Sequence, residues 1–361
     1  MENGRNTLNE IDPTPPIITA SMMWASSRGT TSIWAGLALE LSCFSCFGCD
    51  EHGKEVLPAV FHRDTAVFVL AVGVSYYLRL MVQFTSDPAR TQQRIAALDE
   101  YMTRSVYGAA GFVCRSAAGC SNAAAKRSAD MYEGQLSHVG LHYDMFEDGK
   151  PLRVLVLGME MGRPDRHISL EERRLQQDEA IGERFMKRHA HMLGTTSALR
   201  GAFGRGLGDD RAGELLPIAN NPLPQHVMQC YALVNKRLCS AVRPVQSDKG
   251  RKFQAEKVPA MDRACLPHLA ATVRILEPTL VILQSKNLRS LIKPHLKHVE
   301  RIDEANERLE YAEFAGVSTV IASFSHPAAH SPLNWGSSHR NLYAMDVVEP
   351  TLESARRFLY A

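Results

Sequence analysis

Four short, continuous apolar runs alternate with longer amphipathic segments over the last two-thirds of the chain, and this alternation limits the possible folds most strongly. Runs that lack the polar–apolar alternation of a half-exposed strand are typical of strands buried on both faces of a parallel sheet. The predicted strands are 153–157, 227–234, 279–284 and 317–323, and the predicted helices are 169–192, 194–203, 259–276, 288–296 and 350–360. Strands that alternate with helices predict an α/β fold. We expect a three-layer α/β/α sandwich around a mostly parallel, four-stranded central sheet.

The first hundred residues differ from the rest of the chain. Residues 1–35 are rich in Ser, Thr and Pro and have no periodicity, which is typical of disordered segments. Cys43, Cys46 and Cys49 have a spacing that can bind a metal, but they lack an obvious fourth ligand, so an incidental cluster is the alternative. We expect residues 1–101 to be an N-terminal extension that is poorly ordered or reflects a start assigned too early, and residues 102–361 to form one domain.

Composition and charge narrow the classes of protein. The segment 65–82 is mostly apolar, but Arg79 interrupts it and a bilayer span needs about 20 apolar residues, so we favour a buried segment over a membrane helix. The net charge is only +2, so any contact with nucleic acid requires a local basic patch. Eight cysteines at irregular spacings, with no secretory signal that we can recognise, predict a cytoplasmic protein whose thiols are free or bind metal.

Polar residues follow three of the predicted strands. Glu160 lies in the loop Gly158–Gly162, Asn235 ends the second strand, and His326 follows the fourth. The carboxyl ends of parallel strands meet at one edge of a sheet, where such folds bind their ligands. Each residue also has an ordinary explanation: a solvated loop glutamate, a strand-end turn asparagine, and a structural loop histidine with His330 as a nearby competitor.

A second set of candidates consists of cysteines. Cys114, Cys120, Cys239 and Cys265 would suit zinc or an iron–sulfur cluster if the fold brought them together, whereas isolated buried thiols are the alternative. Cys230 lies inside a predicted strand, and we expect it to be a buried structural thiol.

The segment 235–257 is locally basic. Its acidic residues are Asp248 and Glu256. Its basic residues are Lys236, Arg237, Arg243, Lys249, Arg251, Lys252 and Lys257. Such a segment is compatible with phosphate contacts, and a solvated loop is the alternative.

These motifs, in this order, resemble the uracil-DNA glycosylase superfamily, and most closely its iron–sulfur bacterial and archaeal branch. The motifs are the Gly158–Gly162 loop, the strand that ends in Asn235 before a cysteine, the Cys265–Leu269 segment before an apolar strand, and His326-Pro327. The resemblance covers about residues 110–361. In the loop, Met161 stands where the family has proline; after His326, Ala328 stands where it has serine, and the first cysteine pair is more widely spaced than usual.

The resemblance implies roles for individual residues. Glu160 and His326 would be catalytic, and Gly158, Met159 and Asn235 would bind the base. Phe185 or His191 would supply the aromatic ring that stacks on it. The implied DNA contacts are Lys236, Arg237, Arg251, Lys252 and Leu333, and the implied ligands of a structural 4Fe–4S cluster are Cys114, Cys120, Cys239 and Cys265.

The function that we expect is hydrolysis of the N-glycosidic bond of a damaged base, first of all uracil, flipped out of single- or double-stranded DNA. We expect a monomer with no nucleotide cofactor and no membrane contact. One alternative is a non-catalytic or differently specialised nucleic-acid-binding member of the same fold. Another is an α/β hydrolase or transferase that acts on a small nucleotide. The chain lacks a GxxxxGK[ST] loop, which counts against a nucleoside triphosphatase.

Overall fold

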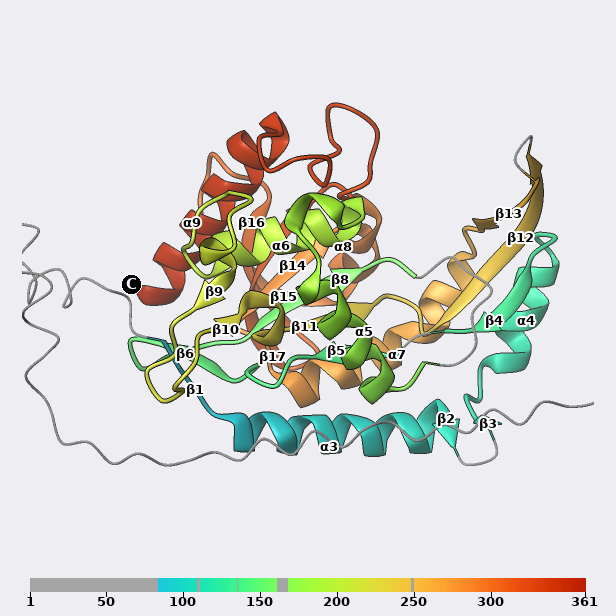
Figure 1. Ribbon diagram of the computed structural model, residues 1–361. Helices are drawn as coiled ribbons and strands as arrows, with labels where there is room; N and C mark the ends of the chain where they lie inside the picture. The colour runs from blue at the N-terminus through green and yellow to red at the C-terminus, as the bar shows by residue number, and fades with distance from the viewer. Residues whose placement is uncertain (1–83, 109–110, 135, 161–167, 248–249) are drawn as a thin grey trace, which may run out of the picture. The chain divides into compact units, whose positions relative to one another are not determined.

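The structure is a computed structural model that describes residues 84–108, 111–134, 136–160, 168–247 and 250–361 (Figure 1). The Cys43–Cys49 run and the apolar segment 65–82 lie outside the described residues. Among the helices that the structure does describe, none is long and apolar enough to cross a membrane.

The centre of the domain is a seven-stranded mixed sheet with the order β15-β16-β17-β14-β8-β11-β5. The strands are β15 Leu296–Arg301, β16 Leu309–Phe314, β17 Val317–Phe324, β14 Leu280–Gln284, β8 Val154–Gly158, β11 Tyr231–Asn235 and β5 His138–Val139. Strands β17, β14, β8 and β11 are consecutive and parallel, while β5, β16 and β15 pair antiparallel at the two edges. The predicted α/β class is therefore confirmed, but the expected four-stranded sheet is the parallel section of a larger mixed sheet.

Two of the three extra strands, β5 and β15, escaped prediction because they carry little apolar pattern. Strand β5 has two residues, and every residue of β15 is exposed or half-exposed. At an edge, backbone pairing with one neighbour is enough to hold a strand in place, so its side chains need not be apolar.

The parallel strands bury side chains on both faces. Val154 and Val156 of β8 belong to one apolar core, together with side chains of helices α6 (Ala190–Ala202) and α9 (Glu349–Tyr360). The intervening Leu155 and Leu157 belong to a second core, with side chains of α3 (Pro88–Ser105), α7 (Pro259–Leu276) and α8 (Lys286–Ile292). Successive side chains of a strand point to opposite faces, so helices on both sides explain why these runs are continuously apolar.

Helix α3 begins before the expected domain boundary between residues 101 and 102. Asp87 caps its first turn by accepting a hydrogen bond from Arg90 N at 2.9 Å, and Pro88 occupies the first helical position. Its Leu98 and Met102 are buried in the second core. The boundary thus falls within a helix that packs on the sheet (Figure 1).

The predicted helix 169–192 is three separate elements. They are α5 Leu170–Gly182, the 3-10 turn Phe185–Lys187 and the start of α6, which also covers the predicted helix 194–203 up to Ala202. Arg188 explains the break, because its buried guanidinium donates to the carbonyl of Ala180 at 3.2 Å and of Glu183 at 3.1 Å. These bonds satisfy carbonyls that a helix end leaves unpaired. At the start of α5, Ser169 is the N-cap and forms a capping box with Glu172.

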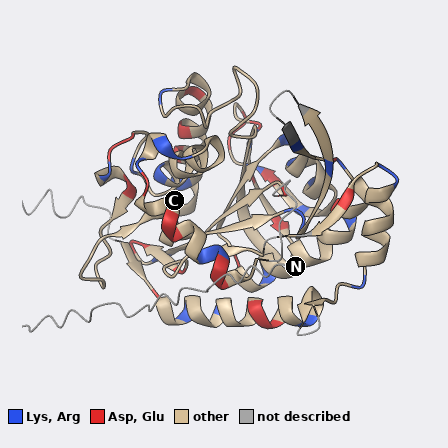
Figure 2. Cartoon of the chain, turned by 45° about the vertical axis from the view of Figure 1, so that its right-hand side comes forward, with Lys and Arg blue, Asp and Glu red and all other residues tan. Residues whose placement is uncertain are grey.

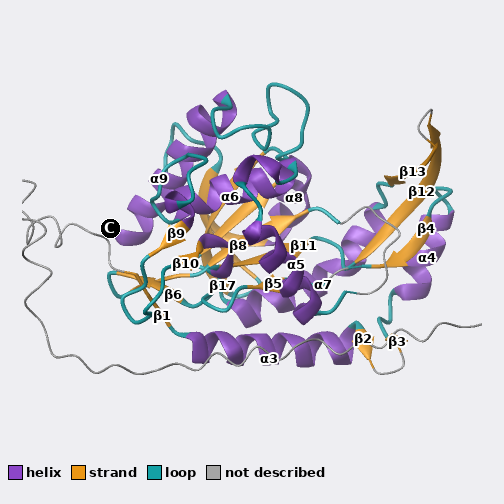
Figure 3. Cartoon of the chain, viewed as in Figure 1, coloured by secondary structure: helices purple, strands orange, loops and turns teal. Residues whose placement is uncertain are grey.

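The basic segment after Asn235 forms a hairpin. Strand β12 (Cys239–Ser247) pairs with β13 (Gly250–Ala255) and with β4 (Asp130–Glu133), and α4 (Ala117–Ala125) packs against β4 (Figure 3). The remaining strands are short. They are β1 Phe84–Ser86, β6 Met145–Glu147 and β7 Lys150–Leu152 in one sheet, β9 Leu215–Leu216 with β10 Gln225–His226, and β2 Tyr107–Gly108 with β3 Gly111–Phe112.

Candidate functional site at the carboxyl edge of the sheet

Asn235 and Gly158 lie side by side at the carboxyl ends of β11 and β8. They are register partners in the parallel pairing, and Lys236 N donates to Gly158 O at 3.0 Å. A methyl group added to Gly158 would lie 3.5 Å from Asn235 Oδ1 and 3.5 Å from His191 Nε2. The amide of Asn235 and the imidazole of His191 therefore meet over the backbone of Gly158. Met159, the next residue, is half-buried and packs against the second core.

His326 lies next to His191, with 5.8 Å between the two ring centroids. Its Nδ1 accepts a hydrogen bond from Ala328 N at 3.1 Å, so the proton of a neutral ring resides on Nε2. Burial lowers the pKa of His326 below its ordinary value, and the negative charge of Glu160 opposes this shift. Burial also lowers the pKa of His191, to about 3. Both rings are neutral at pH 7, and His326 offers an N–H donor. By contrast, His330, the alternative candidate for this role, is exposed.

A closely packed loop fixes the position of His326. The preceding Ser325 donates its hydroxyl to Leu333 O at 2.7 Å, and its carbonyl accepts from Trp335 Nε1 at 2.8 Å. The following Pro327 contacts α6 at Gly194, where a Cβ would lie only 2.6 Å from the Pro327 Cβ. Glycine at position 194 thus permits the close approach of the loop to the helix that carries His191.

Glu160 belongs to a buried cluster of four charges. Its carboxylate accepts a hydrogen bond from Arg237 Nη2, and its Oε2 lies 3.5 Å from Lys236 Nζ. Asp262, in the first turn of α7, lies 3.1 Å from Lys236 Nζ and 3.3 Å from Arg237 Nε. Two cations and two anions thus compensate one another away from water, as buried charges require.

This cluster changes the interpretation of two expected DNA contacts. Lys236 is 4% exposed and Arg237 is 2% exposed, so they hold the carboxylates of Glu160 and Asp262 and are not available to surface phosphates. Sequence alone could not reveal this pairing, because Asp262 is 26 residues from Lys236 along the chain.

The other expected DNA contacts are placed differently. Lys252 is exposed on β13, while the side chain of Arg251 lies outside the described residues. Leu333 is half-buried and packs against the first core. Figure 2 shows that basic and acidic residues alternate along the helices, strands and loops of the domain, in keeping with the near-neutral net charge.

Phe185 lies in a different environment from Asn235. It is buried, its ring meets that of His339 edge-on at 6.0 Å between centroids, and the Arg188 guanidinium lies 5.9 Å from its centroid. Of the two expected stacking candidates, His191 is the one that the structure brings to Asn235 and His326.

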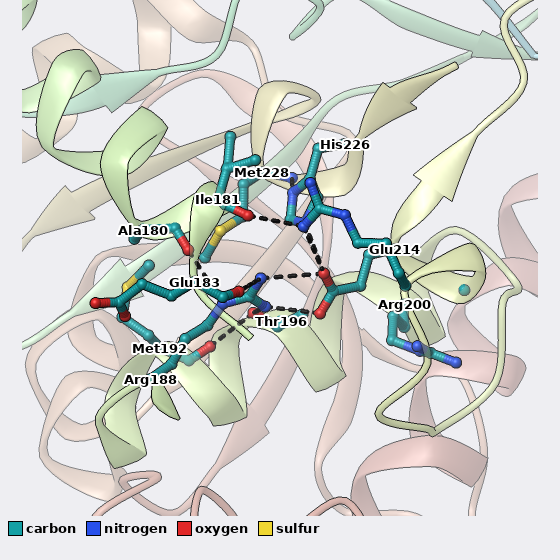
Figure 4. A network of polar contacts seen from close by, with 12 residues as sticks. Ala180, Ile181, Glu183, Arg188, Met192, Thr196, Arg200, Glu214, His226 and Met228 are labelled. Carbon is teal, nitrogen blue, oxygen red and sulfur yellow. Dashed lines mark hydrogen bonds and ion pairs between the residues drawn. The ribbon is translucent and has the colours of Figure 1, made fainter. Parts of the chain in front are cut away.

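Arg188 also joins a buried network that fastens α6 (Figure 4). Its Nη1 donates to Glu214 Oε1 at 2.7 Å and to Thr196 Oγ1 at 3.2 Å, and Glu214 Oε2 accepts from His226 Nε2 at 2.8 Å. His226 Nδ1 accepts from Met228 N at 3.1 Å, which fits a neutral ring. Burial tends to raise the pKa of Glu214, but the hydrogen bonds from His226 and Arg188 lower it to about 2. Burial lowers the pKa of His226.

The four cysteines expected to bind a cluster lie near one another. Cys120 of α4, Cys239 of β12 and Cys265 of α7 belong to one small apolar core. Cys114 Sγ lies 3.5 Å from His268 Nε2, one turn along α7 from Cys265. Burial and the neighbouring thiols of Cys265 and Cys114 raise the pKa of Cys120 to about 11.

An all-thiol set in an apolar pocket is the donor chemistry of a soft metal or an iron–sulfur cluster. Within the described ranges, however, no three His, Cys, Asp or Glu side chains are arranged so that they could already hold a metal ion. Cys230 lies apart in the sheet core, as expected for a structural thiol, with its Sγ 3.6 Å from His226 O.

No family model matches the sequence, and no curated protein matches it significantly.

Proposed function

We propose that the protein hydrolyses the N-glycosidic bond of a base flipped out of DNA, with uracil as the first substrate to test. The observation that carries the proposal is the convergence of Asn235, His326 and Glu160 at the carboxyl edge of the parallel section of the sheet. Asn235 and His326 both neighbour His191, and the charge of Glu160 acts on His326. Recognition of a planar base requires a hydrogen-bond donor and an acceptor along its edge. Its departure requires stabilisation of the negative charge on the base and of the positive charge on the sugar.

Each residue has a distinct role. The amide of Asn235 donates to and accepts from the edge of the base. The Nε2–H of neutral His326 donates to the oxygen of the departing base as negative charge develops there. His191, with its ring 5.8 Å from that of His326, provides the aromatic surface beside the base.

Glu160 stabilises the cationic sugar and orients the attacking water. One of its oxygens already accepts from Arg237, but Oε2 is buried and accepts no hydrogen bond from the residues that the structure describes. That oxygen has a free lone pair for a water molecule. Holding the other oxygen fixes the direction in which Oε2 faces.

The resemblance to the iron–sulfur glycosylases extends this proposal to the three-layer architecture and to the cysteines. Cys114, Cys120, Cys239 and Cys265 would hold a structural cluster, with zinc as the alternative. Its ligands come from the segment before α4, from α4, from β12 and from α7, so the group would tie the β12–β13 hairpin to the domain.

The second candidate is a nucleic-acid-binding protein of the same fold without catalysis. The observation that favours it is the buried ion pairing of Glu160, because a carboxylate held by Lys236 and Arg237 already has a structural role without catalysis.

One experiment separates the two candidates. Purified protein is incubated with a labelled uracil oligonucleotide, which is then treated with alkali to cut at abasic sites. Cleavage at uracil that is lost in His326→Ala and kept in the matched variant His330→Ala supports the glycosylase. Binding of the oligonucleotide without cleavage at uracil, hypoxanthine or xanthine supports the second candidate.

A further inference from the structure

A cavity of about 460 Å³ lies between α8, the β15–β16 turn and the end of β17, outside the site described above. Its lining is mainly polar and strongly basic. The cations are Lys286, Arg289, Lys293, Arg301 and Arg308, and the acid among the lining residues is Glu307.

Most of this positive charge is not compensated. Arg289 pairs with Glu310 at 3.2 Å, and Arg301 lies 4.0 Å from Glu304. Lys286, Lys293 and Arg308 form no ion pair with any residue in the described part of the chain. Three cations that converge on one hollow without acidic partners repel one another, so an anion in the cavity would stabilise the arrangement.

A second observation, independent of charge, also indicates a missing ligand. Ser323 of β17 lines the cavity and is 8% exposed, yet its hydroxyl is buried without a hydrogen-bond partner among the described residues. Buried hydroxyls nearly always have a partner. A ligand with acceptor oxygens would satisfy Ser323 and the three cations together, which is the chemistry of a phosphate.

The cavity is close enough to the candidate site to serve the same substrate. Ser323 precedes His326 by three residues, which corresponds to about 10 Å along an extended chain. A DNA strand advances about 3.4 Å per nucleotide along the helix axis, so this distance is about three nucleotides.

We propose that this cavity binds a backbone phosphate of the DNA strand within about three nucleotides of the base held at Asn235. The proposal rests on the proposed function for its choice of ligand. Lys286, Lys293 and Arg308 supply the charge, and the Ser323 hydroxyl donates to a phosphate oxygen. The cavity thereby supplies the phosphate contact that was expected of Lys236 and Arg237, whose charges are instead paired with the buried Glu160.

The test is equilibrium binding of an undamaged, fluorescently labelled single-stranded oligonucleotide at several NaCl concentrations. The variant is Lys286→Ala/Lys293→Ala, because both side chains are exposed and their loss leaves the core intact. Its matched control is Lys150→Ala/Lys297→Ala, which removes the same charge from exposed positions outside the cavity. Each lost phosphate contact should reduce the slope of log K against log salt by about 0.7, and the control should keep the parent slope.

A second variant, Ser323→Ala, leaves all charges in place. It should weaken binding by several-fold without changing the salt slope, because it removes one hydrogen bond to a phosphate oxygen. Equal affinity and slope for the parent and both cavity variants would overturn the proposal. So would binding of a deoxynucleoside monophosphate at this cavity without binding of the oligonucleotide, since the ligand would then be a free phosphate ester.

Uracil cleavage on the same preparations keeps this proposal separate from the proposed function. DNA binding that depends on the cavity, without cleavage of uracil, contradicts the proposed glycosylase activity and supports phosphate binding in the cavity. If uracil is cleaved but DNA binding does not depend on the cavity, the glycosylase activity is supported and phosphate binding in the cavity is contradicted.

Discussion

Arg237 donates a hydrogen bond to the carboxylate of Glu160, although both residues were expected to act separately, one on phosphate and the other on water. With Lys236 and Asp262 they form a compact set of two positive and two negative charges beneath the candidate site. The pairing fixes the orientation of the Glu160 carboxylate. It also makes the Glu160 carboxylate, to which we assign a catalytic role, part of a buried structural cluster.

Glu160→Gln should therefore affect both activity and stability. Loss of the carboxylate charge should slow single-turnover cleavage by about 10²–10⁴-fold. It also leaves Arg237 and Lys236 with one acid, and breaking a buried pair typically costs about 3–5 kcal/mol. Single-turnover kinetics and urea denaturation of the same protein measure the two effects. A variant as fast as the parent would show that the carboxylate has only a structural role.

His326→Ala should slow cleavage by about 10²–10³-fold, the usual cost of losing one preorganised donor to a developing oxyanion. His330→Ala should have no effect, because that side chain is exposed. Burial lowers the pKa of His326, so the active neutral form should persist below pH 6.5. The rate should stay constant between pH 8 and about pH 6.5 and fall only at lower pH. A rate that rises as pH falls through about 6.5 would contradict a neutral donor.

The Arg188–Glu214–His226 network should make stability depend on pH. The folded-state pKa of His226 is lowered, so its contribution is complete above about pH 6.5 and decreases as pH falls below that value. The pKa of Glu214 is lowered to about 2, so its contribution is complete above about pH 4.5 and is lost as pH falls toward 2.

Urea midpoints at pH 7.5, 5.5 and 4.5 should therefore decrease in that order, with a smaller decrease in His226→Asn. The buried His138 and His191, whose pKa values are each lowered to about 3, add to the decrease in both proteins. Identical midpoints at pH 7.5 and 4.5 would contradict the assigned neutral state of these rings.

Gly194→Ala should disturb the site from a distance. The new methyl group would lie 2.6 Å from Pro327 Cβ, so the loop that carries His326 must move away from α6. Overpacking of this kind costs about 1–3 kcal/mol, and cleavage should slow more than DNA binding weakens. Gly182→Ala is the matched control, because an added methyl group there meets nothing within 4 Å. Equal behaviour of the two variants would show that the loop adapts without displacing His326.

Cys265→Ala should abolish bound iron, whereas Cys230→Ala should retain it. Cys265 shares an apolar core with Cys120 and Cys239, while Cys230 belongs to the sheet core. Loss of a ligand also removes folding free energy, so Cys265→Ala should be less soluble. Iron and zinc contents, with the visible absorption of anaerobically purified protein, are the measurements. A Cys265→Ala protein with full metal content would show that the ligand set is wrong.

The sequence predicted those parts of the fold whose pattern repeats along the chain. The parallel strands β8, β11, β14 and β17 are buried on both faces, and such burial requires continuous apolar runs. Helix α7 has the predicted bounds because Pro259 and Pro278 mark its two ends. Edge strands β5 and β15 carry no such pattern, because β5 has only two residues and the side chains of β15 are exposed or half-exposed.

In the candidate site, the sequence could place Asn235 and His326 at one edge because strand ends have predictable positions. It could not reveal burial or long-range pairing. Lys236 and Arg237 looked like surface charges, since their partners Asp262 and Glu160 lie 26 and 77 residues away. The basic cavity was hidden for the same reason, since its cations come from α8, from the 3-10 turn after it, from β15 and from the turn before β16.

Helix α3 and strand β1 determine the shortest piece of this chain that can fold as a unit. Phe84 of β1 packs into the core on one side of the sheet, and Leu98 and Met102 of α3 pack into the core on the other. A protein that begins at Met102 would thus lose packing from both cores. It would also lack Arg94, which lies 3.0 Å from the buried Asp144 carboxylate. A stable fragment for crystallisation or isotope labelling must begin no later than Phe84.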